Sequence, residues 1–94
     1  MDNKKLRRTL QSAGMECFVN YLLIFNDRNI SDAEVAKIIK NERNYTDLAC
    51  KTRTRHSRMI IDAGKLQEAL QVIASSKKVE FKATEKAKEL LQLL

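Results

Sequence analysis

The chain has 94 residues, 44% apolar and 32% charged, which is enough for one hydrophobic core but not for two. It has no proline and only two glycines, whereas strands and hairpins need frequent turn residues between short alternating runs. We therefore expect a single all-α domain over residues 1–94, a compact bundle of about five helices. The formal net charge of +6 suits a polyanionic partner.

The apolar runs are too short to span a membrane. The longest covers residues 18–25 and is interrupted by Asn20, far short of the roughly 20 residues that a span needs. Glu16 interrupts the apolar region that a signal peptide would require, so secretion is not expected. Cys17 and Cys50 lie on apolar helical segments, which favours buried, reduced thiols in a cytoplasmic protein, with a disulfide as the open alternative.

The first predicted helix runs from about Lys4 to Asn26, with Asp2 or Asn3 as its N-cap. Gly14 is expected to loosen or kink it. The helix carries two apolar stripes displaced around its axis, one with Leu6, Leu10, Ala13, Cys17 and Ile24 and the other with Met15, Phe18, Leu22 and Phe25. Because a helix that is apolar on two sides must be buried on both, we expect it to be central to the domain or shared between two copies.

A short second helix is predicted from its start signal. Ser31 and Glu34 have the spacing of a capping box, and the polar residues 41–44 read as the loop that ends the helix. The same kind of signal then repeats, because Thr46 is a suitable N-cap and Asp47 places negative charge in the first turn of a third helix. This third helix is expected to end at Ala63, before Gly64.

Two further helices complete the prediction. The fourth starts directly after Gly64, and the last starts near Ala83 or Thr84, after a brief piece at residues 79–81 that alternates as an extended segment would. The last turn is strongly apolar, with Leu90, Leu91, Leu93 and Leu94. Because a small monomer cannot easily bury all of these residues, we predict a homodimer formed through the first and last helices.

The segment from Ser31 to Ala63 resembles a helix-turn-helix, the DNA-binding unit of many bacterial and phage proteins. It has a short capped helix, a polar connection and a longer basic helix. The resemblance implies that the third helix lies in the major groove of double-stranded DNA while the second helix braces it, and that the chain regulates transcription. The connection over residues 41–45 departs from the motif, since it is longer than the usual turn of about 3–4 residues and contains no glycine.

A helical wheel gives the candidate DNA contacts. Lys51, Arg55 and Arg58 fall on one side of the third helix, with Thr54 beside them and Arg53 on a flank, and no acidic residue lies between Asp47 and Asp62. These cations can contact phosphates or guanine edges. The opposite side is predicted to face the core and carries Ala49, Thr52, His56, Met59, Ile60 and Ala63.

A second hypothesis is a helical protein-interaction module that docks on an acidic protein surface. It would be an adaptor, an antitoxin or immunity partner, or a phage inhibitor of a host enzyme, and the apolar surplus of the first and last helices favours it. His56 is expected to be hydrogen-bonded or half-buried, and the cysteines lack the short paired spacing of zinc ligands, so no metal is predicted. No glycine-rich loop or nucleophile–base set is recognisable, so we expect neither a cofactor nor an enzyme.

Overall fold

Seven helices and no strand make up the computed structural model, which describes all 94 residues. The all-α prediction is confirmed, and the number of helices exceeds the predicted five. The molecule measures 29 × 26 × 24 Å along its principal axes. In chain order the helices are α1 (Asn3–Ala13), α2 (Met15–Asn20), α3 (Leu22–Phe25), α4 (Asp32–Glu42), α5 (Asp47–Asp62), α6 (Leu66–Ala74) and α7 (Phe81–Leu93).

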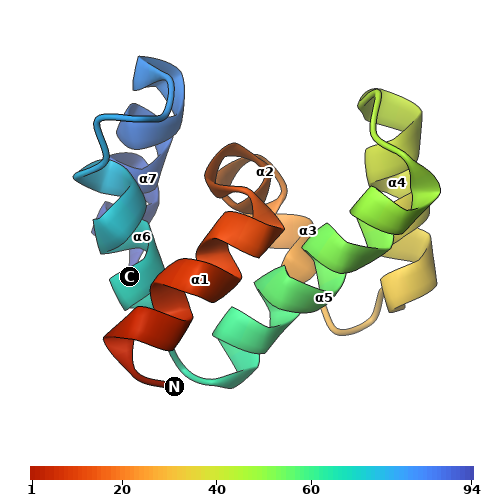
Figure 1. The fold of residues 1–94 in the computed structure, drawn as a ribbon, viewed down its shortest axis with the longest axis horizontal. Coiled ribbons are helices and arrows are strands. Elements are labelled where there is room, and N and C mark those ends of the chain that lie inside the picture. The colour runs from red at the N-terminus through yellow and green to blue at the C-terminus, as the bar shows by residue number, and fades with distance from the viewer.

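The difference in number arises in residues 3–25, where one predicted helix is three. Gly14 separates α1 from α2 with a φ of 84° and a ψ of 118°, a backbone conformation that few residues other than glycine adopt. Tyr21 separates α2 from α3 with a φ of −118° and a ψ of 19°. Because the chain changes direction at Gly14, α1 packs against α5 while α2 packs against α7 (Figure 1). Both apolar stripes are therefore buried inside one chain, and they give no reason to share this segment with a second copy.

The predicted helix starts are confirmed by their hydrogen bonds. The Asp2 carboxylate accepts from the Lys5 N–H at 2.7 Å, and the Thr46 hydroxyl accepts from the Ala49 N–H at 3.1 Å. At the start of α4, the Ser31 hydroxyl accepts from the Glu34 N–H at 3.2 Å and donates to the Glu34 carboxylate at 3.1 Å. Each cap satisfies a backbone donor that the first turn leaves free, and stabilises its helix by about 1 kcal/mol.

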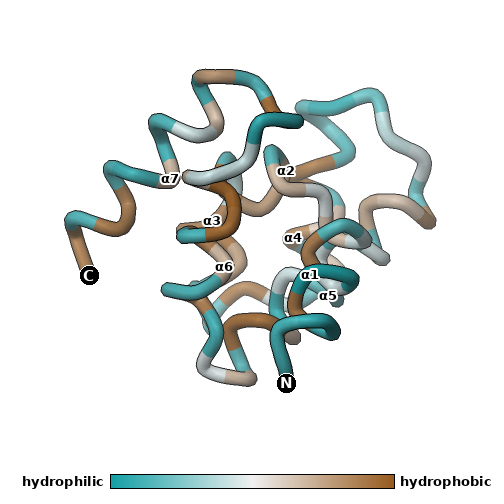
Figure 2. Tube along the Cα trace, turned by 60° about the vertical axis from the view of Figure 1, so that its left-hand side comes forward, coloured by the Kyte–Doolittle hydropathy of each residue, from teal (hydrophilic) through white to brown (hydrophobic).

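The hydrophobic core consists of two clusters that meet along α5. The larger cluster lies between α1, α2, α6 and α7 and includes Leu10, Phe18 and Leu70, and the smaller one lies beneath α4 and includes Phe25 and Ile39. Helix α5 contributes to both clusters. In Figure 1, α4 lies at one side of the molecule and the α6–α7 pair at the other, with α1 and α5 running between them. Figure 2 shows hydrophilic and hydrophobic stretches following one another along the longer helices, as amphipathic packing requires.

The C-terminal pair differs slightly from its prediction. Helix α5 ends as expected, since Gly64 has the left-handed φ of 72° and its N–H bonds to the Ile61 carbonyl. Helix α7 begins at Phe81, two residues before the predicted start, and the expected extended piece is reduced to its N-cap, Glu80, at a φ of −60° and a ψ of 149°. None of the seven helices combines the length and hydrophobicity that a membrane span needs.

Candidate nucleic-acid interface

Helix α5 carries the predicted interface, and its two neighbours determine which side chains are accessible. It lies between α1 and α4 and packs against both of them (Figure 1). A helix flanked on two sides buries a wide arc, so only a narrow stripe reaches solvent. The central part of that stripe consists of Leu48, Lys51, Arg55 and Met59, which recur every three or four residues.

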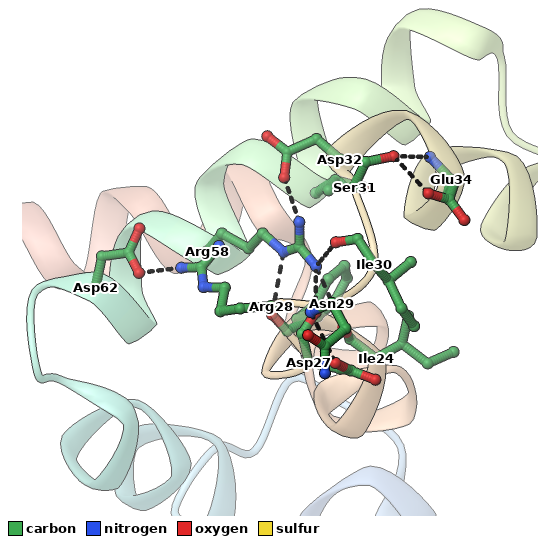
Figure 3. Close-up of polar contacts among 12 residues, drawn as sticks. Ile24, Asp27, Arg28, Asn29, Ile30, Ser31, Asp32, Glu34, Arg58 and Asp62 are labelled. Carbon is green, nitrogen blue, oxygen red and sulfur yellow. Dashed lines mark hydrogen bonds and ion pairs between the residues drawn. The ribbon is translucent and has the colours of Figure 1, made fainter.

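Arg58 is not on this stripe, and its prediction as a DNA contact is wrong. Its side chain is only 5% exposed and turns toward the segment from α3 to the start of α4 (Figure 3). Its Nε donates to the Phe25 carbonyl at 3.1 Å, and its Nη2 donates to three further carbonyls, those of Ile24 at 3.4 Å, Asp27 at 2.9 Å and Ile30 at 2.8 Å.

The Arg58 Nη1 also forms an ion pair with the Asp32 carboxylate at the start of α4. Arginine can occupy such a site because its planar guanidinium offers five N–H donors in a fixed arrangement. The last carbonyls of a helix lack intrahelical donors, and the Arg58 guanidinium donates to those of Ile24 and Phe25 in α3 as well as to two carbonyls beyond it. The residue is therefore a structural element of this fold, and it is not available to phosphates or bases.

Of the other predicted contacts, Thr54 is buried, and Arg53 is partly occupied by contacts within the molecule. Thr54 is 1% exposed, and its hydroxyl donates to the Cys50 carbonyl one turn earlier at 2.8 Å, so its prediction as a DNA contact is also wrong. Arg53 is half-buried, with its Nη1 donating to the Ala13 carbonyl at 3.2 Å and its guanidinium carbon 4.2 Å from the centre of the Tyr45 ring. A cation held over an aromatic face in this way is favourable, and it fixes Arg53 against α1.

The prediction of which side chains of α5 face the core is also only partly correct. Ile60 is buried as expected, whereas Met59 and Ala63 are exposed. His56 is half-buried, and its Nδ1 lies 2.8 Å from the Thr52 carbonyl, so the prediction of a hydrogen-bonded imidazole is confirmed. Because a carbonyl oxygen only accepts, the Nδ1 carries the proton.

Lys51 and Arg55 remain as the exposed cations of the predicted set. Neither takes part in any of the four ion pairs of the molecule. A cavity of about 230 Å³ lies beside Lys51, between α4 and α5, and its charged lining consists of Lys37 and Lys40 of α4 and Asp47 and Lys51 of α5. The structure thus brings cations from two helices together along one groove.

The lysines of α4 were missed because the prediction treated that helix only as a brace. Lys37 is exposed and makes no ion pair. Lys40 is partly engaged, since its ammonium donates to the Tyr45 carbonyl at 2.7 Å and lies 3.8 Å from the Asp47 carboxylate. Their spacing of three residues is the signal that could have placed both on one side of α4. The basic surface therefore consists of Lys37, Lys51 and Arg55, with Lys40 at its edge.

The remaining reactive groups of the sequence analysis are the two cysteines. Cys17 and Cys50 are both buried free thiols, as predicted. Burial raises the pKa of the Cys17 thiol, and the nearby Arg53 guanidinium offsets part of this rise. No three side chains of the types that hold metal ions lie together.

Comparison with known proteins gives no relative of this chain. No family model, curated protein or solved structure matches it. Its function is therefore inferred from the geometry alone.

Proposed function

We propose that the chain binds double-stranded DNA through backbone phosphates, on the face formed by α4 and the exposed stripe of α5. The observation that carries the proposal is the set of three exposed cations, Lys37, Lys51 and Arg55, which make no ion pair and lie on two packed helices. A cation without a carboxylate partner can bind a phosphate without first losing an internal contact. Each such contact releases condensed counterions, which is the main source of sequence-independent affinity.

Contact with phosphates is favoured over reading of the base sequence. Arg58 and Thr54, two of the predicted DNA contacts, are buried. Phosphate contacts position a protein on a duplex but carry no direct sequence information. The proposed activity is therefore duplex binding with little sequence preference, and control of transcription from one specific operator is not part of it.

The test is titration of a labelled duplex, followed by fluorescence anisotropy at several salt concentrations. We expect a steep decrease in affinity with salt, and expect Lys51→Ala and Arg55→Ala each to weaken binding about five- to tenfold near 0.1 M salt and to flatten the salt slope by about 0.9. Lys37→Ala is expected to act in the same direction. Lys86→Ala is the matched control, because Lys86 is an exposed lysine of α7 outside this face.

Two outcomes would contradict the proposal. One is duplex binding that Lys51→Ala, Arg55→Ala and Lys86→Ala weaken equally, which would indicate diffuse attraction by net charge. The other is the absence of binding at low salt, where electrostatic attraction is strongest.

A protein partner is the second candidate, and one observation favours it. Leu48 is 74% exposed and Met59 is 37% exposed, and they lie on the same stripe as the two cations. Apolar side chains spaced along one helix face are typical of helices that dock in a groove of another protein. This function predicts a partner with an apolar groove and acidic rims. Its binding would be lost on Leu48→Ser with Met59→Ser, two changes that leave phosphate contacts intact.

A further inference from the structure

A cavity of about 660 Å³ lies away from the basic face, between α1 and α6, and we call it the α1–α6 hollow. It exists because each of these helices packs mainly on another partner, α1 on α5 and α6 on α7. Its volume falls within the range of about 300–1,000 Å³ that is typical of small-molecule sites. The α4–α5 groove shares none of its lining residues.

Three cations converge on the α1–α6 hollow. Arg7 comes from α1, and Lys77 and Lys78 come from the segment after α6. All three are exposed and make no ion pair. Cations in a recess attract an anionic group more strongly than the same charges spread over a convex surface, because the protein walls exclude water.

The hollow also contains an acceptor that lacks a donor. Glu68 of α6 lines it, and the Glu68 Oε2 is buried without any hydrogen-bond partner, even though Arg7 lines the same recess. A buried acceptor without a donor is unfavourable. The terminal torsion of a glutamate is soft, so a small rotation turns either carboxylate oxygen toward an N–H group that enters the hollow.

The apolar part of the lining is small and comes from three residues, Leu6, Met15 and Val72. Such a surface can contact the face of one ring, and a methionine adapts readily to an aromatic partner. The hollow thus offers positive charge, a carboxylate acceptor and a limited apolar surface at the same time.

From this combination we propose that the α1–α6 hollow binds a small ligand of the nucleoside monophosphate class. Lys77, Lys78 and Arg7 hold the phosphoryl group, and Glu68 accepts a hydrogen bond from an N–H of the base. Met15 and Val72 contact the base plane. This site is independent of the proposed DNA-binding face, and either one can fail without the other.

Three probes separate these contributions in a heteronuclear NMR titration of the full chain. Inosine monophosphate carries both a phosphate and a ring N–H, inosine lacks the phosphate, and ribose 5-phosphate lacks the base. We expect saturable binding of inosine monophosphate, with shifts concentrated at the residues of the α1–α6 hollow. We also expect affinities at least about tenfold weaker for the other two probes.

Variants then test each contact. Lys77→Ala combined with Lys78→Ala is expected to weaken inosine monophosphate at least about tenfold and to leave inosine unchanged. Glu68→Gln is expected to weaken inosine monophosphate and inosine and to leave ribose 5-phosphate unchanged, because an amide can still occupy the site but is a weaker acceptor. Lys86→Ala, an exposed lysine outside the hollow, is the control and is expected to change nothing.

Three results would overturn the proposal. These are the absence of saturable binding up to about 10 mM probe, equal affinity for all three probes, and shifts that map to α4 and α5. The last result would show that the phosphate binds to the exposed cations of the α4–α5 face instead.

Discussion

At the scale of single residues, Arg58 contributes most to the architecture. Its guanidinium joins α5 to the carbonyls of residues 24–30 and to Asp32, so one side chain holds the connection between α3 and α4 in place (Figure 3). Removing it would take the guanidinium donors from these carbonyls and leave the Asp32 carboxylate without its ion-pair partner. Such losses are among the few single changes that cost several kcal/mol.

We therefore expect Arg58→Ala to lower the free energy of unfolding by about 3–5 kcal/mol, measured by urea denaturation. Arg58→Lys should be intermediate, because an ammonium keeps the charge but offers fewer donors in a different geometry. Arg55→Ala is the matched control, since it removes an exposed arginine three residues away and should change stability by less than about 0.5 kcal/mol. Equal effects of Arg58→Ala and Arg55→Ala would refute the structural role.

The buried Cys17 thiol is expected to make the free energy of unfolding decrease as the pH becomes alkaline. Burial raises the pKa of its thiol above the ordinary value of 9.0, so the unfolded chain loses this proton at a lower pH than the folded chain does. The stabilisation that the neutral thiol contributes is therefore complete at pH values below the ordinary, unfolded-state pKa. It is lost as the pH rises through the folded-state pKa. Urea denaturation at about pH 7 and about pH 10 should show this decrease, and Cys17→Ala should reduce the decrease even though it lowers stability overall. An unchanged pH dependence in Cys17→Ala would contradict this assignment.

At the scale of elements, the sequence predicts where helices begin better than where they are interrupted. The caps at Asp2, Ser31 and Thr46 follow from local chemistry, because each side chain bonds to a backbone donor three residues later. The breaks at Gly14 and Tyr21 do not, because the hydrophobic pattern continues through both positions and only packing against α5 and α7 selects the bent path. A local pattern cannot show which of two buried stripes meets which neighbour.

Gly14 is the point at which this bend can be tested. A side chain there would adopt a strained backbone conformation and would also collide with the Arg53 guanidinium, which bonds to the adjacent Ala13 carbonyl. Gly14→Ala should therefore destabilise the fold by about 2 kcal/mol or more. Gly64→Ala is the matched control, because it also has a positive φ but no atom near the added carbon, and it should cost about 1 kcal/mol. A smaller loss in Gly14→Ala than in Gly64→Ala would contradict the account.

The candidate interface was predictable only in part, for a reason specific to helix packing. Lys51 and Arg55 are exposed as expected, but the helical wheel assigned Arg58 to solvent because it treats every arginine as polar surface. The wheel has no information about the backbone carbonyls of residues 24–30, to which this particular guanidinium donates. Tertiary partners that are distant in sequence therefore decided which face of α5 is accessible.

At the scale of the whole molecule, the predicted homodimer depends on the end of α7. Leu93 is 81% exposed and Leu94 lies beside it in solvent, whereas the apolar stripes of residues 3–25 are covered within one chain. Size-exclusion chromatography with light scattering should show a dimer at high micromolar concentration that Leu93→Ser with Leu94→Ser dissociates, because the contact would lose its apolar area. Leu23→Ser is the control, as it changes an equally exposed leucine of α3. A monomer at every concentration would exclude the dimer.

The division of the core into two clusters also affects how the molecule moves. The smaller cluster, beneath α4, contains fewer buried side chains than the cluster between α1, α2, α6 and α7. Regions with less buried apolar contact open more readily than the rest of a domain, without global unfolding. We therefore expect the amide groups of α4 to exchange with solvent before those of the helices that surround the larger cluster. A surface on a helix that opens locally can change its shape when a partner binds, while the helices around the larger cluster keep their arrangement.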